Sequence, residues 1–138
     1  MISARNQIEG TVREVVPGAV NGIVKIDAAA GNHVSATISM EAINQLGLKP
    51  GVKCKAIIKA TEVMMANDYC KISARNQFKG TIASVTPGAV NAIVKLDVPG
   101  GIGITSTISL EAVKELGLKA GDTAVAIVKA TSVMVAVD

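Results

Sequence analysis

The amino-acid sequence consists of two copies of one unit, offset by 70 residues along a chain of 138 residues. More than half of the residue pairs at this offset are identical, and the alignment needs no gap. The repeat is longer than the usual solenoid repeats, and two copies are too few to build a solenoid. We therefore expect two homologous domains, residues 1–68 and residues 71–138.

Each half is close to the size at which a single hydrophobic core is marginal, so docking between the halves or oligomerisation is expected to add stability. Apolar residues make up 49% of the chain, whereas aromatic residues make up only 1%. The apolar residues are mainly Ala, Val and Ile, and β-branched side chains favour pleated, buried strands. The composition therefore indicates a globular, strand-rich protein.

Hydrophobic periodicity and turn residues predict the same element order in both halves. In the first half a short helix is expected at 39–47, because Ser39 is a suitable N-cap and Gly47 a suitable C-terminal stop. The predicted strands of this half are 8–16, 21–28, 33–38, 52–59 and 62–66, with a bend at Ala60-Thr61. The predicted fold is all-β with short helices: two tandem five-stranded OB-like barrels, with one short helix in each.

Polar residues that occur in both copies are hydrogen-bond donors. Ser3-Ala4-Arg5-Asn6-Gln7 returns unchanged at 73–77, and these segments hold two of the three arginines. Lys59-Ala60-Thr61 returns at 129–131, and Ser39 at the helix start returns as Ser109. Charged nitrogens, hydroxyl groups and the free N–H groups of a helix start suit an oxyanion.

Groups that perform acid–base or nucleophilic chemistry are not duplicated in this way. Cys54 and His33 correspond to Ala124 and Gly103 in the other copy, Cys70 lies at the junction of the copies, and neither cysteine has the spacing of a zinc motif. Asp27 and Asp97 are duplicated, but they alternate with apolar strand residues and are expected at the surface. The pattern therefore predicts anion binding and not an enzyme.

The net charge of +3 is mildly basic, and there is no continuous run of Lys and Arg. An OB barrel that binds single-stranded nucleic acid stacks bases on aromatic side chains, and this chain has only Tyr69 and Phe78. No apolar stretch approaches the roughly 18 residues of a membrane span, and the N-terminus lacks the apolar core of a signal peptide. We expect a cytoplasmic protein with no nucleic-acid or membrane partner.

Five motifs occur in the same order in both halves: Ser-Ala-Arg-Asn-Gln, Gly-Ala-Val-Asn, Thr-Ile-Ser, Leu-Gly-Leu-Lys and Lys-Ala-Thr-x-Val-Met. Together they resemble the Mop domain of molybdate-binding proteins, and two tandem copies resemble the di-Mop molbindins. The resemblance implies OB folds, assembly as a homo-oligomer (a trimer for di-Mop chains), and molybdate or tungstate as the ligand. It also implies intracellular molybdate storage and homeostasis, with no organic cofactor.

The resemblance implies oxyanion sites between domains or subunits. One domain would supply the Ser-Ala-Arg-Asn segment, and a neighbour would supply the Lys-Ala-Thr segment, with the serine at the helix start near the anion. In the first copy these residues are Ser3, Ala4, Arg5 and Asn6, then Lys59, Ala60 and Thr61, and Ser39. The second copy would use Ser73, Ala74, Arg75, Asn76, Lys129, Ala130, Thr131 and Ser109. A second class of site on a symmetry axis would use Val20, Asn21, Val90 and Asn91.

Simpler interpretations of these residues stay open at this point. Ser39 and Ser109 are suitable as helix caps only, and Lys59 and Lys129 as solvated strand ends. The arginines could form structural ion pairs, and Gly18 to Asn21 could be a turn only. A molybdate-sensing interaction module needs the same pocket as a storage protein, so the sequence does not separate these two functions.

Overall fold

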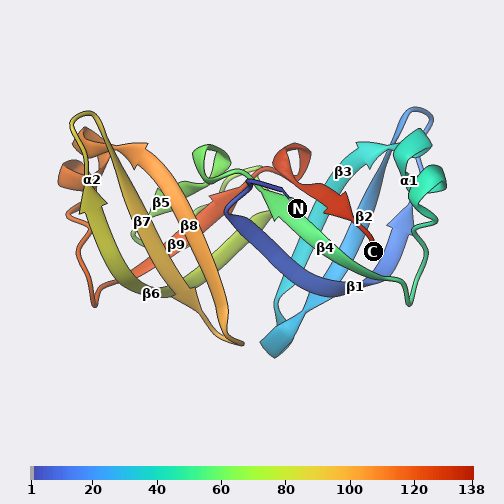
Figure 1. The fold of residues 1–138 in the computed structure, drawn as a ribbon, viewed down its shortest axis with the longest axis horizontal. Helices are drawn as coiled ribbons and strands as arrows, with labels where there is room; N and C mark the ends of the chain where they lie inside the picture. Colours follow the sequence, from blue (N-terminus) through green and yellow to red (C-terminus); the bar gives the residue numbers. More distant parts are fainter. Residues whose placement is uncertain (1) are drawn as a thin grey trace.

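The computed structural model describes residues 2–138 and contains two curled sheets of five strands that lie side by side (Figure 1). The first half contributes β1 (Asn6–Val16), β2 (Asn21–Ala28), β3 (His33–Ser39), α1 (Met40–Leu46), β4 (Lys53–Ile58) and β5 (Met64–Ala66). The second half contributes β6 (Asn76–Pro87), β7 (Asn91–Val98), β8 (Ile102–Ser109), α2 (Leu110–Leu116), β9 (Thr123–Val128) and β10 (Met134–Ala136). Three short 3₁₀ turns are η1 (Ala29–Gly31), η2 (Ala60–Glu62) and η3 (Ala130–Ser132).

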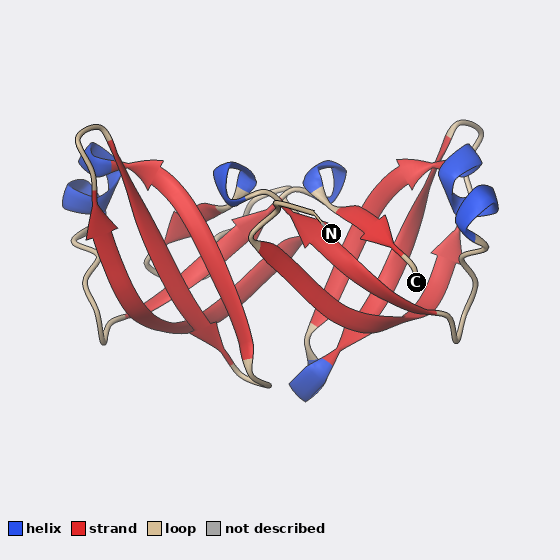
Figure 2. Ribbon diagram, in the orientation of Figure 1, coloured by secondary structure: helices blue, strands red, loops and turns tan. Residues whose placement is uncertain are grey.

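The predicted fold class is confirmed, and local chemistry explains the boundaries. Helix α1 begins after Ser39, whose Oγ accepts a hydrogen bond from the Ala42 N–H at 3.1 Å. It ends at Gly47, which adopts the left-handed conformation with φ of 65°. The two helices lie at the outer ends of the molecule, whereas η2 and η3 lie close to its middle (Figure 2).

The short last strand of each half belongs to the sheet of the other half. The strand order is β10-β4-β1-β2-β3 in the first sheet and β5-β9-β6-β7-β8 in the second. Met134 of β10 pairs with Ile57 of β4, and Met64 of β5 pairs with Ile127 of β9. The expectation that each half completes its own sheet is therefore wrong for this strand. Residues 1–68 and 71–138 are the units of the sequence repeat, but each sheet takes its last strand from the other unit.

The strand exchange results from the path of the chain after β4 and β9. The predicted bend at Ala60-Thr61 is the single 3₁₀ turn η2, in which the Val63 N–H donates to the Ala60 carbonyl. Instead of turning back along its own sheet, the chain continues from η2 into the opposite barrel. Val63 and Val133, which follow the two turns, are almost fully buried there, so the exchange adds apolar surface to the core.

The hydrophobic core runs through both barrels and is built mainly from Ala, Val, Ile and Leu. Phe78 is buried at the position that Ile8 occupies in the first half. Small and β-branched side chains fill the narrow barrels without any tryptophan, as the composition predicts. No helix within residues 2–138 is long and apolar enough to cross a bilayer.

Candidate anion-binding site

The pairing of β1 with β4 brings the first two duplicated donor segments together. Asn6 lies opposite Ile58 in this pairing, so Arg5, just before β1, and Lys59, just after β4, lie beside each other. They open onto a cavity of about 280 Å³. It is lined by Ile2, Ser3, Ala4, Arg5, Lys59, Ala60, Thr61 and Met134.

The second copy forms the equivalent arrangement through the pairing of β6 with β9, in which Asn76 lies opposite Val128. Its cavity is larger, about 450 Å³, because the opposite barrel supplies a further wall. The second half lines it with Ser73, Ala74, Arg75, Lys129, Ala130 and Thr131. The first barrel lines it with Val16, Ile23, Lys25, Ser35 and Thr37.

The expectation that a neighbouring domain or subunit brings its Lys-Ala-Thr segment against Ser3 to Asn6 stays a prediction, because the structure describes one chain. Within that chain, Ser3 to Arg5 and Lys59 to Thr61 of the same half line one cavity. The physical reason is the register of β1 and β4, which fixes both segments at one end of the sheet. Met134, which lines the first cavity, comes from the other half of the chain through the exchanged strand β10, whereas Lys25 and its neighbours line the second cavity from the opposite barrel.

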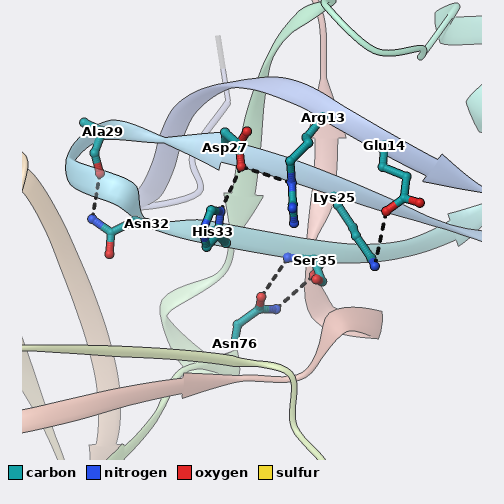
Figure 3. Close-up of polar contacts among 9 residues, drawn as sticks. All are labelled: Arg13, Glu14, Lys25, Asp27, Ala29, Asn32, His33, Ser35 and Asn76. Atoms are coloured by element: carbon teal, nitrogen blue, oxygen red, sulfur yellow. Dashed lines mark hydrogen bonds and ion pairs between the residues drawn. The ribbon is translucent and has the colours of Figure 1, made fainter.

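Asn6 and Asn76 line neither cavity. The Asn76 Nδ2 donates to the Ser35 carbonyl at 2.9 Å, and its Oδ1 accepts from the Ser35 N–H at 2.7 Å (Figure 3). Asn6 makes the same two bonds with Thr105. Both side chains are buried and span the two barrels, so they hold the donor segments in place and do not offer their amides to a ligand.

Ser39 and Ser109 lie away from both cavities. Each caps its helix and pairs, in the register of the sheet, with Asn21 or Asn91. Val20 and Val90 precede these asparagines, and both are more than 70% exposed. The six residues thus form two separate groups, one at the outer end of each barrel, and the structure does not bring them to the Arg-Lys cavities.

The positive charge in the two cavities comes from arginine and lysine side chains. Arg5 and Lys59 face the first cavity, whereas Arg75, Lys129 and Lys25 face the second. Lys25 Nζ lies 3.3 Å from Glu14 Oε1 (Figure 3). Between the two cavities, Ser132 Oγ of η3 donates to Glu62 Oε2 of η2 at 3.2 Å. This bond joins the two Lys-Ala-Thr turns to each other.

The groups that line the two cavities are suited to binding a ligand. Arginine and lysine nitrogens, serine and threonine hydroxyls and backbone N–H groups surround each cavity, and no carboxylate, histidine or cysteine lines either one. Within the described residues there is no group of three or more His, Cys, Asp or Glu side chains placed to hold a metal ion. The arrangement therefore suits an anion and not a bare cation.

Lys25 and Ser35 line the second cavity without belonging to any motif of the sequence analysis, whereas Thr37 belongs to the Thr-Ile-Ser motif but was not among the expected site residues. A signal is present, because Lys25 is duplicated as Lys95 between apolar strand residues, as an outward-facing cation would be. What the sequence does not contain is the docking angle of the barrels, which turns this outer face of β2 and β3 toward Arg75 of the other half.

Comparisons with known proteins agree with this architecture. The family model of the TOBE domain matches residues 2–65 and again residues 72–135. A crystal structure of the cytoplasmic molybdate-binding protein ModG, with molybdate bound, superposes with a TM-score of 0.97 at 42% identity and covers 99% of both chains. The chain is also 39% identical over 137 residues to the molybdenum transport protein ModE of Herbaspirillum seropedicae. It is 60% identical over 68 residues to a probable molybdenum-pterin-binding protein of Haemophilus influenzae.

These matches cover different shares of the relatives. The chain spans 51% of the Herbaspirillum protein, and half of this chain spans 99% of the Haemophilus protein. The tandem arrangement inferred from the resemblance to the Mop domain is confirmed by the two matched ranges and by the ModG structure. The chain belongs to the TOBE-domain family and carries two TOBE domains in tandem.

Proposed function

We propose that this protein binds molybdate or tungstate reversibly at the two Arg-Lys cavities and serves as an intracellular, cytoplasmic store of the anion. The observation that carries the proposal is the meeting of Ser-Ala-Arg with Lys-Ala-Thr, twice in one chain. The likeness to ModG, which is described as a cytoplasmic molybdate-binding protein, supports the choice of ligand and location.

The donor set favours a fully deprotonated tetrahedral dianion. Arginine and lysine provide charge-assisted hydrogen bonds, and backbone N–H groups of Ala4 and Ala60 have no lone pair to offer a protonated anion. The donor segments adjoin the ends of paired strands, so little backbone freedom is lost when the ligand binds. The larger radius of molybdate and tungstate relative to sulfate is the basis of selectivity in this proposal.

Assembly into a homo-oligomer, with a trimer as the state that the resemblance implies, is part of the proposal. Val16 and Ile93 are about 40% exposed on the outer faces of the barrels, and Val16 lines the larger cavity. A second copy that covers these residues would also close the cavities. Ligand and assembly would then stabilise each other by mass action.

Calorimetry on the intact protein tests this function. Wild-type protein is expected to bind molybdate and tungstate in a fixed ratio and to bind sulfate much more weakly. Arg5→Ala and Arg75→Ala are each expected to lower the ratio, whereas Lys49→Ala, which removes an exposed cation that lines neither cavity, is expected to preserve it. Absence of heat and of retained molybdenum in equilibrium dialysis would overturn the proposal.

A further inference from the structure

We propose that the two anion sites of one chain differ in their charges, and that Glu14 lowers the affinity of the Arg75–Lys129 site by pairing with Lys25 on its wall. This inference rests on the proposed function and assigns an affinity-setting role to a residue that does not line either cavity. The observation that supports it is the ion pair of Glu14 with Lys25, because Lys25 lines the cavity beside Arg75, whereas Lys95 does not line the cavity beside Arg5 and position 84 is serine.

Glu14 and its counterpart Ser84 occupy equivalent places in the sheets. In the β1–β2 pairing Glu14 lies opposite Lys25, and in the β6–β7 pairing Ser84 lies opposite Lys95. Both positions follow a register shift in the longer strand. Glu14 forms an ion pair with Lys25, whereas no carboxylate within residues 2–138 forms an ion pair with Lys95.

Lys95 is placed relative to the Arg5 segment as Lys25 is placed relative to the Arg75 segment. Lys25 lies opposite Ser35, whose backbone is bound by Asn76, the residue after Arg75. Lys95 lies opposite Thr105, whose backbone is bound by Asn6, the residue after Arg5. The two lysines thus have equivalent places in the strand register, but only Lys25 lines an anion cavity together with an arginine of the other half.

The other charges near the cavities do not produce the same difference. Arg5 and Lys59 of one site correspond to Arg75 and Lys129 of the other. Glu62 has no acidic counterpart, since position 132 is serine, but the two side chains are hydrogen-bonded to each other between the turns. The Glu62 charge therefore acts on both sites, and Glu14 remains as the charge specific to one of them.

The direction of the effect follows from electrostatics. A carboxylate 3.3 Å from Lys25 Nζ cancels much of the field of this cation and repels an incoming dianion. Lys25 and Glu14 are 38% and 54% exposed, so solvent screens part of the effect. The strength of exposed charge pairs corresponds to a difference in affinity of about two- to fivefold.

The test isolates one site at a time in otherwise intact protein. Arg5→Ala leaves the Arg75–Lys129 site, and adding Glu14→Ser gives this site the neutral partner that the other half has. Molybdate calorimetry is expected to show affinity rising about two- to fivefold, with less gain at high salt. In the Arg75→Ala background, Ser84→Glu is expected to change the affinity of the Arg5–Lys59 site less, because Lys95 does not line that cavity.

Glu9→Ser is the matched control, because it removes a carboxylate from the same strand at a position that lines neither anion cavity. Its expected effect is small, and the melting temperature of each variant shows that the fold is retained. If Glu14→Ser changes affinity no more than Glu9→Ser does, the inference is overturned while the proposed function stands. If the wild-type protein binds no molybdate at all, the proposed function and the inference both fail.

Discussion

The side chain of Asn6 in the first half is hydrogen-bonded to the backbone of Thr105 in the second half, 99 residues away along the chain. The Asn6 Nδ2 donates to the Thr105 carbonyl at 2.8 Å, and the Thr105 N–H donates to Asn6 Oδ1 at 2.7 Å. Asn76 makes the same pair of hydrogen bonds with the backbone of Ser35. Each asparagine directly follows an arginine of a donor segment, so the contact that docks the barrels also positions the candidate anion sites.

Asn6→Ala is expected to lower the free energy of unfolding by about 1–3 kcal/mol, since it leaves buried backbone groups of Thr105 without partners. Urea unfolding followed by circular dichroism measures this change. Gln7→Ala is the control, because the adjacent Gln7 side chain makes only a long, exposed bond of 3.4 Å to the Ala4 carbonyl. Equal stability of the two variants would contradict the docking role of Asn6.

Gly22 and Ile43 form a size-matched pair between β2 and α1. A Cβ at Gly22 would lie 2.6 Å from Ile43 Cδ1 and 2.8 Å from Met40 Sδ, whereas the second half has Ala92 and Val113 at the equivalent positions. Gly22→Ala is therefore expected to cost about 1–3 kcal/mol through overpacking. Adding Ile43→Val is expected to recover most of this loss in the same unfolding measurement. Failure of the double variant to regain stability would show that the pair is not coupled.

Local order was predictable from the sequence because its causes are local. Ser39 and Gly47 determine the ends of α1, and the alternating pattern from Asn21 to Ala28 gives β2 with the bounds that were expected. The repeat also identified the Arg5 and Lys59 segments, which the structure places at one cavity. These features depend on capping, periodicity and strand register, which a sequence records directly.

The strand exchange was not predictable because the two exchanged strands are chemically alike. Met64 and Ala66 of β5 correspond to Met134 and Ala136 of β10, so pairing within a half and pairing between halves place the same residue types at these positions. The sequence also did not show that Asn6 is buried and joins the two barrels, for a related reason. The Asn6 amide could donate either to a ligand or to a backbone carbonyl, and the docking of the barrels determines that it donates to the backbone.

The exchange predicts how a half behaves alone. A chain of residues 1–68 contains a β5 whose partner, β9, is missing, and a β4 edge without β10. Because the two halves are equivalent, this fragment is expected to exchange β5 with a second copy and form a dimer, as measured by analytical ultracentrifugation. Deleting residues 64–68 removes the exchanged strand and is expected to abolish that dimer. A stable monomer of residues 1–68 would contradict the prediction.

The two cysteines are expected to differ in reactivity. Cys54 is 6% exposed, and burial raises the pKa of its thiol, which disfavours the reactive thiolate. Cys70 lies exposed between the halves. A thiol reagent at neutral pH is expected to label Cys70 rapidly in native protein and to reach Cys54 only on unfolding. In Cys70→Ser protein, rapid labelling under native conditions would show that the first barrel opens easily.

The most direct measurement of the central claim is an anomalous difference map at the molybdenum absorption edge, from crystals grown with molybdate. If the two cavities bind the anion, peaks are expected within hydrogen-bonding distance of Arg5 and Lys59 in one cavity and of Arg75 and Lys129 in the other. Peaks only at the outer ends of the barrels, beside Val20 and Val90, or no ordered molybdenum at all, would contradict it.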